Sequence, residues 1–148
     1  GSEGEPMTAT PNHNELLDVD PLMMDVLLDH YKHPHNFGPL PGAEIVHAEG
    51  NPSCGDQMEI AVKTEGGIIQ DIKFQGKGCI ISQAAASILT DLMKGEPLER
   101  VRDFTRDDML ENIGIPIGPM RLKCALLALK VLKSGVYGQA PWPGEDEE

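Results

Sequence analysis

Apolar residues recur every three or four positions in three long stretches of the chain, and this spacing predicts amphipathic helices. The three helices are expected over residues 21–33, 79–94 and 121–133. The first begins at Pro21, with Asp20 as its N-cap, and ends before Pro34, because proline disfavours helical geometry in the residue ahead of it. Gly135 and Gly138 end the third. The buried stripe of the third helix is expected to be Met120, Cys124, Leu127 and Val131.

Residues 57–76 have the alternation of a β-hairpin, with Gly66-Gly67 as its turn. One face of the hairpin is expected to carry Met58, Ile60 and Val62 from the first strand and Ile68, Ile72 and Phe74 from the second. A further strand is expected over residues 43–48, a loop over 49–56, and short helices over 98–104 and 107–112. Strands come first and most helices afterwards, which predicts an α+β fold in which helices cover a three-stranded antiparallel sheet.

The length of 148 residues, 40% of them hydrophobic, favours one domain, which we place at residues 21–138. Nine of the 24 acidic residues and none of the 12 basic ones lie in residues 1–20 and 141–148. We expect residues 1–20, whose Gly1-Ser2 is typical of a cloning remnant, to be a disordered acidic lead, and residues 139–148 to be an acidic tail. The lack of a basic surface argues against nucleic-acid binding.

The chain has three cysteines, an odd and low number for a disulfide framework. No apolar run approaches a membrane span and no export signal is visible, so we expect a cytoplasmic protein with reduced thiols and no membrane partner.

The three thiols and one carboxylate all lie at the ends of predicted elements. Cys54 and Asp56 share a loop, whereas Cys79 and Cys124 lie at helix N-termini, where the helix dipole favours thiolate. Three sulfurs and one carboxylate would suit tetrahedral zinc or an iron–sulfur cluster. The spacing alone leaves open that Cys79 and Cys124 are small buried core residues. Cys54 fits that alternative poorly, because its Pro-Ser-Cys-Gly-Asp loop is a poor place for a core residue.

Four motifs resemble those of the NifU/IscU/SufU family of iron–sulfur cluster assembly proteins. Three of them surround the cysteines and the fourth follows the first helix: Asn51–Asp56 (NPSCGD), Gly76–Ser82 (GKGCIIS), Arg121–Ala125 (RLKCA), and His30-Tyr31 with Pro34, Asn36 and Gly38. The resemblance covers residues 22–134 and implies a scaffold that receives sulfur from a cysteine desulfurase and passes clusters to apo iron–sulfur proteins. It also implies that Cys54, Asp56, Cys79 and Cys124 bind zinc, or iron as a [2Fe–2S] cluster.

The chain combines features of two branches of this family. Lys123 precedes the third cysteine as in the SufU branch, where the IscU branch has histidine. Cys79 and Cys124 are 45 positions apart, which leaves no room for the insertion that the SufU branch carries. The chaperone-recognition segment of the IscU branch is represented only by Ile117–Arg121. We rank a cluster assembly scaffold first and a zinc-bound sulfur acceptor that stimulates a desulfurase, a zinc-dependent sulfurtransferase, second. A purely structural zinc site is third, because such sites rarely use aspartate.

Further roles follow from position. Cys54 is expected to be the first sulfur acceptor, because its Gly/Pro-flanked loop can reach outward. We also expect the purified protein to contain zinc, which a site with three thiolates prefers. Arg121 and Lys123 either steady the charge of the thiolates or form a solvated first turn.

Other candidates are given structural roles. We assign His30, His33 and His35 to surface or packing positions, because Pro34 breaks their spacing. Asp107-Asp108 is expected to begin a helix, and Trp142 lies in a Pro-rich exit whose path stays open.

Overall fold

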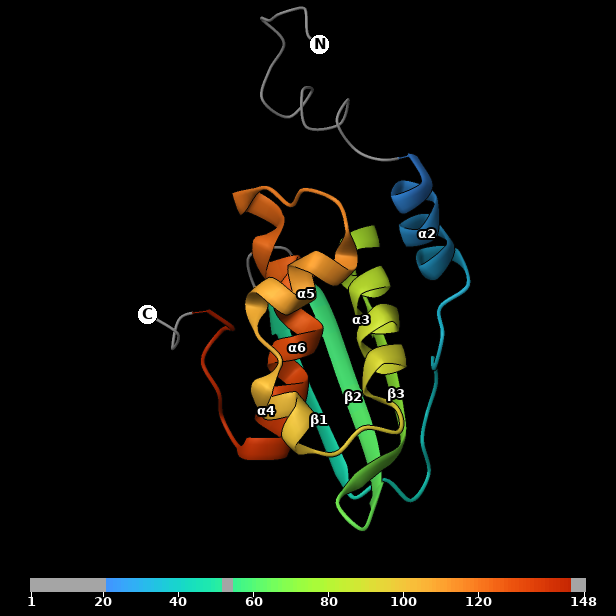
Figure 1. The fold of residues 1–148 in the computed structure, drawn as a ribbon, viewed down its shortest axis with the longest axis vertical. Helices are drawn as coiled ribbons and strands as arrows, with labels where there is room; N and C mark the ends of the chain where they lie inside the picture. The colour runs from blue at the N-terminus through green and yellow to red at the C-terminus, as the bar shows by residue number, and fades with distance from the viewer. Residues whose placement is uncertain (1–20, 52–54, 145–148) are drawn as a thin grey trace, which may run out of the picture.

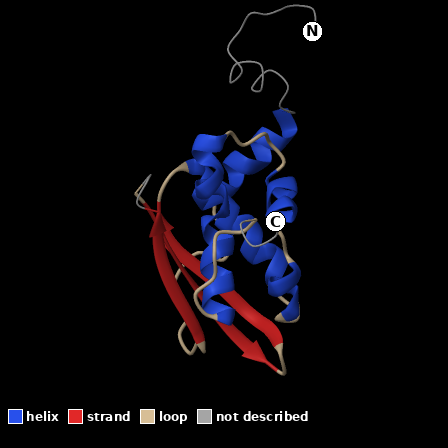
Figure 2. Cartoon of the chain, turned by 90° about the vertical axis from the view of Figure 1, so that its left-hand side faces the viewer, coloured by secondary structure: helices blue, strands red, loops and turns tan. Residues whose placement is uncertain are grey.

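The computed structural model describes residues 21–51 and 55–144. The elements in chain order are α2 (Pro21–Lys32), β1 (Ile45–Asn51), β2 (Asp56–Glu65), β3 (Ile68–Lys77), α3 (Ile80–Met93), α4 (Glu99–Asp103), α5 (Arg106–Ile113), a 3₁₀ turn (Pro119–Arg121) and α6 (Leu122–Tyr137). The strands form one antiparallel sheet in the order β1-β2-β3. Helices cover one face of it, which Figure 2 shows edge-on, so the predicted α+β architecture is confirmed. No helix in the described ranges is both long and apolar enough to cross a membrane.

The core lies between the sheet and the two long helices α3 and α6, which run along its inner face (Figure 1). It is mostly aliphatic, although Phe74 and Phe104 are fully buried within it. The expected inward alternation of Met58, Ile60 and Val62 on β2 is confirmed. The sheet and helices therefore meet in one continuous apolar layer that fixes where their ends lie.

Strand β1 begins later and ends later than the sequence predicts. Its last residue, Asn51, pairs with Asp56, the first residue of β2. Residues 49–51 thus belong to a strand, and the prediction of a loop over 49–56 was wrong for them and for Asp56. Backbone pairing overrides the local turn signal here, and it places Asp56 at the end of a paired strand.

The β2–β3 hairpin is confirmed, with Gly66 and Gly67 at positive φ in its turn. One detail differs from the prediction. The register shifts between Lys63, which pairs with Asp71, and Thr64, which pairs with Ile69 instead of the adjacent Gln70. This irregularity turns Ile69 into the core at 0% exposure and leaves Ile68 40% exposed, because one extra residue reverses the alternation.

Helix α6 continues beyond its predicted end and passes through Gly135. A Cβ atom at Gly135 would lie 3.0 Å from the Cβ of His47 and 3.3 Å from Cγ2 of Ile45 on β1. This glycine therefore serves the close approach of helix and strand rather than helix termination. Cys124 is buried as predicted, whereas Met120 is 91% exposed because it belongs to the 3₁₀ turn before α6.

The segment after α2 lies along the outer edge of β3. The N–H of Phe74 donates to the carbonyl of Asn36 at 2.9 Å, and the N–H of Gly38 donates to the carbonyl of Phe74 at 2.9 Å. Asn36 has a positive φ of 57°, which an asparagine tolerates better than most residues. The predicted end of the first helix before Pro34 is confirmed, and the chain after it is held against both α3 and the sheet.

Candidate metal centre

Three of the four expected ligands meet at one end of the sheet. Asp56 is the first residue of β2, Cys79 is the N-cap residue of α3, and Cys124 is the third residue of α6. One carboxylate oxygen and the two sulfur atoms all lie within 4.8 Å of one another. Residues that are 23 to 68 positions apart in the sequence thus converge because a strand start and two helix starts share this end of the fold.

The cluster is well sheltered. Asp56 is 3% exposed and Cys124 is 2% exposed, whereas Cys79 is partly exposed. Cys79 Sγ lies 3.6 Å from Asp56 Oδ2 and 3.9 Å from the hydroxyl of Ser82. That hydroxyl also donates to the backbone carbonyl of Cys79 at 3.2 Å. Ser82 was not singled out from the sequence, and its contacts hold the first turn of α3 against the cysteine.

Gly78 makes room for the carboxylate. A Cβ atom at this position would lie 2.6 Å from Cγ and Oδ1 of Asp56 and 2.6 Å from Oγ of Ser82. A Cβ atom does not approach other heavy atoms this closely, so any side chain at Gly78 would displace Asp56 or Ser82. The glycine next to Cys79 is therefore required by the packing of the cluster itself.

The chemistry of these donors fits a metal ion. Burying a carboxylate is costly unless an opposite charge accompanies it. Among the described residues no lysine or arginine forms an ion pair with Asp56, whose polar neighbour is instead a thiol. Zinc takes cysteine sulfur at about 2.3 Å and carboxylate oxygen at about 2.0–2.2 Å, and its charge would offset both thiolate and carboxylate. The residues present fit zinc or the iron of a cluster.

The other predicted site residues are placed less directly. Cys54 lies outside the described residues. Arg121 is the exposed N-cap residue of α6. Lys123 is exposed, and its ammonium lies 5.0 Å from the ring centroid of Trp142, a cation–π contact. Trp142 packs against the core, which answers the question that the sequence left open about its path.

A partly buried ion pair near the Trp142 ring was missed by the sequence analysis. The ammonium of Lys130 donates to the carboxylate of Glu49 on β1 and lies 5.4 Å from the Trp142 ring. His47 Nε2 lies 2.7 Å from the same carboxylate. Burial acts to raise the pKa of Glu49, but the hydrogen bonds with Lys130 and His47 outweigh it and lower this pKa. The pair links β1 to α6, and no local motif announces it.

The expectation that Asp107-Asp108 begins a helix is confirmed. Asp108 lies in the first turn of α5 and forms a capping box with Thr105. The backbone N–H of Thr105 donates to this carboxylate and lowers the pKa of Asp108. His30 and His35 pack against α3, whereas His33 is exposed and lies 3.5 Å from Asp29.

Comparison with known proteins gives a consistent result. The family model described as "NifU-like N terminal domain" matches residues 22–140. The zinc-dependent sulfurtransferase SufU of Bacillus subtilis is 35% identical over 136 residues, covering 80% of this chain and 92% of that protein. The iron–sulfur cluster assembly scaffold protein IscU 1 of Archaeoglobus fulgidus is 36% identical over 112 residues, covering 76% of this chain and 72% of that protein.

The same fold occurs among solved structures. The crystal structure of the N-terminal part of a nitrogen-fixing NifU-like protein from Brucella abortus superposes with a TM-score of 0.64. It covers 78% of this chain and 96% of that chain at 20% identity, a level at which the likeness shows the fold alone.

Proposed function

The chain belongs to the family of NifU-like N-terminal domains, and we propose that it is an iron–sulfur cluster assembly scaffold that accepts sulfur from a cysteine desulfurase. The observation that carries this proposal is the convergence of Asp56, Cys79 and Cys124 within 4.8 Å. Each of the three lies in one of the motifs that resemble the family, and relatives named as scaffolds are 34–36% identical over most of this chain. The cargo is a [2Fe–2S] cluster, delivered to apo iron–sulfur proteins.

In this proposal the ligands are Asp56, Cys79 and Cys124 together with Cys54. Cys54 takes up sulfur first: its thiolate attacks the outer sulfur of a persulfide on the desulfurase, and the cysteine of the desulfurase leaves as a thiolate. Cys79 and Cys124 are fixed at helix starts, where the N-terminal end of the helix stabilises thiolate. Zinc, when bound, holds the thiolates together and keeps them from oxidation.

Asp56 makes the centre suited to release. A carboxylate is a harder ligand than thiolate and binds a soft iron–sulfur centre less tightly. Its position, wedged between Gly78 and the Cys79 sulfur, keeps it aimed at the cargo. We expect Asp56→Ala to retain a cluster longer and to transfer it more slowly. Asp107→Ala is the matched control, since that carboxylate is 85% exposed and lies on α5.

The test is anaerobic reconstitution with ferrous iron, cysteine, a cysteine desulfurase and a thiol reductant, which supplies the remaining electrons that reduce persulfide sulfur to sulfide. Visible absorption reports cluster formation, and zinc is measured in the same sample. The scaffold proposal predicts about one [2Fe–2S] cluster per functional unit, loss of that cluster in Cys79→Ser and Cys124→Ser, and its transfer to an added apo-ferredoxin. Absence of any cluster in wild-type protein that is correctly folded would overturn it.

A second function, a zinc-bound sulfurtransferase that stimulates a desulfurase, is favoured by Lys123. This lysine stands where the IscU branch has histidine and agrees with the SufU branch, and one relative at 35% identity is named as a zinc-dependent sulfurtransferase. In this case zinc stays bound, the desulfurase turns over faster and Cys54 carries the persulfide. Peptide mass spectrometry of the persulfide, with Cys54→Ser as comparison, separates this outcome from cluster assembly.

A further inference from the structure

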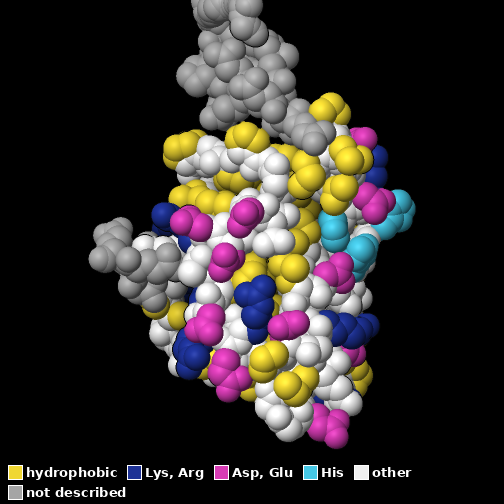
Figure 3. All heavy atoms as spheres, viewed as in Figure 1, with side chains coloured by type: hydrophobic (Ala, Val, Ile, Leu, Met, Phe, Trp, Pro, Cys, Tyr) yellow, Lys and Arg dark blue, Asp and Glu magenta, His cyan; other side chains and the backbone are white. Residues whose placement is uncertain are grey.

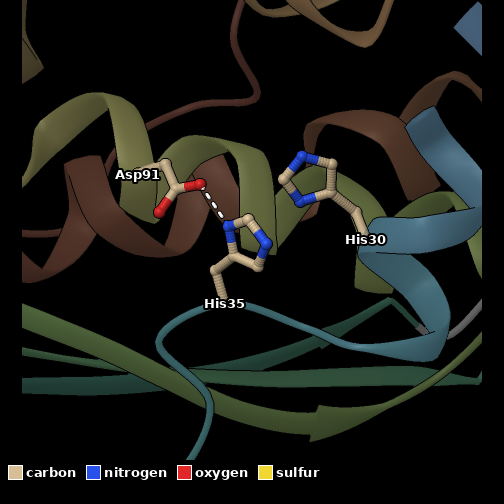
Figure 4. A group of neighbouring side chains, drawn as sticks. All are labelled: His30, His35 and Asp91. Atoms are coloured by element: carbon tan, nitrogen blue, oxygen red, sulfur yellow. Dashed lines mark hydrogen bonds and ion pairs between the residues drawn. The ribbon is translucent and has the colours of Figure 1, made fainter.

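A second group of ligand-type side chains lies on the flank of the molecule, apart from the thiols. His30 comes from the last turn of α2, His35 from the segment after it, and Asp91 from α3 (Figure 4). One ring nitrogen from each histidine and one carboxylate oxygen all lie within 4.8 Å of one another. The two imidazole rings are close, with centroids 4.5 Å apart. Three separate segments of the chain thus direct donor atoms to one place.

Hydrogen bonds hold these side chains in position. His35 Nδ1 lies 2.5 Å from Asp91 Oδ2, a contact that holds the imidazole ring of His35 against α3. The buried hydroxyl of Ser87 contacts His30 Nδ1 at 2.7 Å and the backbone N–H of His35 at 2.8 Å. Asn36 donates to the other oxygen of Asp91 at 2.9 Å. Each of the three side chains is held by a neighbour on α3 or on the segment after α2. Binding of an ion would therefore cost little additional conformational entropy in these side chains.

The cluster is open enough to admit an ion. The side chains of His35 and Asp91 are 47% and 44% exposed, and Figure 3 shows histidine side chains gathered at this flank beside acidic ones. Zinc bonds of about 2.0–2.1 Å to histidine nitrogen imply ligand atoms about 3.3 Å apart in a tetrahedron. The donors therefore need to move by little more than 1 Å, and water can fill the remaining coordination position.

We propose that His30, His35 and Asp91 form a second metal site, which binds a divalent transition ion such as Zn²⁺. Imidazole donors suit zinc, copper, iron and nickel ions. Asp91 and Cys79 are 12 residues apart along α3, or about 18 Å at 1.5 Å per residue. The two sites are thus too far apart to share one ion. With two histidines and one carboxylate in partial contact with water, the second site exchanges its metal more readily than the thiols do.

The experiment titrates Zn²⁺ into the full chain whose thiol centre already holds one equivalent of zinc. Isothermal calorimetry counts further equivalents, and nitrogen-15 spectra of the imidazole rings report which histidines respond. We expect one further equivalent and shifted ring nitrogens of His30 and His35. His35→Gln and Asp91→Asn should each weaken this binding at least tenfold without changing the zinc content of the thiol centre.

His33→Gln is the matched control, because His33 is a neighbour in sequence but lies apart from the cluster, near Asp29. It should bind the further equivalent as wild type does. Thermal melts verify that each variant is folded, and Asp91→Asn keeps the proposal testable should His35→Gln fail to fold. Binding of the further equivalent that is equal in wild type and Asp91→Asn, or its absence at millimolar Zn²⁺, would overturn the site.

Discussion

The two ends of α3 carry donor sets of opposite character. At its start, Cys79 joins Asp56 and Cys124 in a sheltered cluster that three element ends create. Near its other end, Asp91 joins His30 and His35 in a cluster that is half exposed and held by hydrogen bonds. The first depends on the packing of the whole fold, whereas the second depends on how α2 and its exit segment dock onto one helix. Substitutions or metal removal at one cluster should therefore leave the other cluster unchanged.

Zinc removal should have the largest effect, and at the thiol centre. A ligand present at 1,000 times its Kd stabilises by about 4 kcal/mol, which for about 150 residues corresponds to a Tm change on the order of 10 °C. We expect chelation to lower the Tm of the zinc-loaded protein by about this amount in calorimetry. Cys124→Ser should melt at the lower temperature whether or not chelator is present, and a chelator effect that persists in this variant would place the stabilising ion elsewhere.

Gly78→Ala should have the next largest effect. Its Cβ would overlap the Asp56 carboxylate and Ser82, and overpacking of this kind costs about 1–3 kcal/mol. Urea unfolding should show this loss together with weaker zinc binding at the thiol centre, whereas the His30–His35–Asp91 cluster should be unaffected. Gly118→Ala is the control, because a Cβ there meets no atom within 4 Å. Equal stability of the two variants would contradict the packing argument.

Ser87→Ala should act on the other cluster. It removes the hydroxyl that contacts the ring of His30 and the N–H of His35, and leaving a buried polar group without its partner costs about 1–3 kcal/mol. We expect a loss near the lower end of this range in urea unfolding, because His35 is partly exposed. Hydrogen exchange should rise in α2 and the exit segment but not in the first turn of α3. Faster exchange around Cys79 would show that the two clusters are not independent.

The smallest effect concerns pH and belongs to neither cluster. The pKa of Glu49 is lowered against the opposing effect of burial, by hydrogen bonds with Lys130, His47 and Ser134. Its contribution to stability is therefore present above the ordinary glutamate pKa of 4.5 and is lost as pH falls through the lower folded-state value. Glu49→Gln should unfold with a shallower dependence on pH below 4.5, measured by urea midpoints. An unchanged slope would show that this carboxylate is not linked to folding.

Much of this architecture could be predicted because periodicity and local signals agree. Alternation located β2, and Pro21 and Pro34 bounded the first helix. Three cysteine motifs named the thiol centre before its geometry was known. What failed were features that depend on partners far away in the chain. The register shift that exchanges Ile68 for Ile69 leaves no trace in the alternation, and Gly135 signals a helix end unless β1 is known to lie against it.

The histidine cluster shows the same limit. His30 and His35 were assigned to packing because Pro34 disrupts helical spacing between them, and they do pack on α3. Their common neighbour Asp91 lies 56 positions beyond His35, where no local pattern connects them. Only the docking of α2 on α3 brings the three donors together, so a search by spacing cannot find them.

Gly135 has a mechanical consequence for the thiol centre. It lies 11 residues after Cys124 on the same helix, a separation of about 16 Å. At Gly135, α6 packs closely against β1, and Cys124 lies near the other end of the same helix. Gly135→Ala would push α6 away from β1 by a few tenths of an ångström, and the tilt of the helix would move Cys124 as well. A substitution at Gly135, about 16 Å from the thiol centre, would therefore change the distance between the sulfur atoms of Cys79 and Cys124.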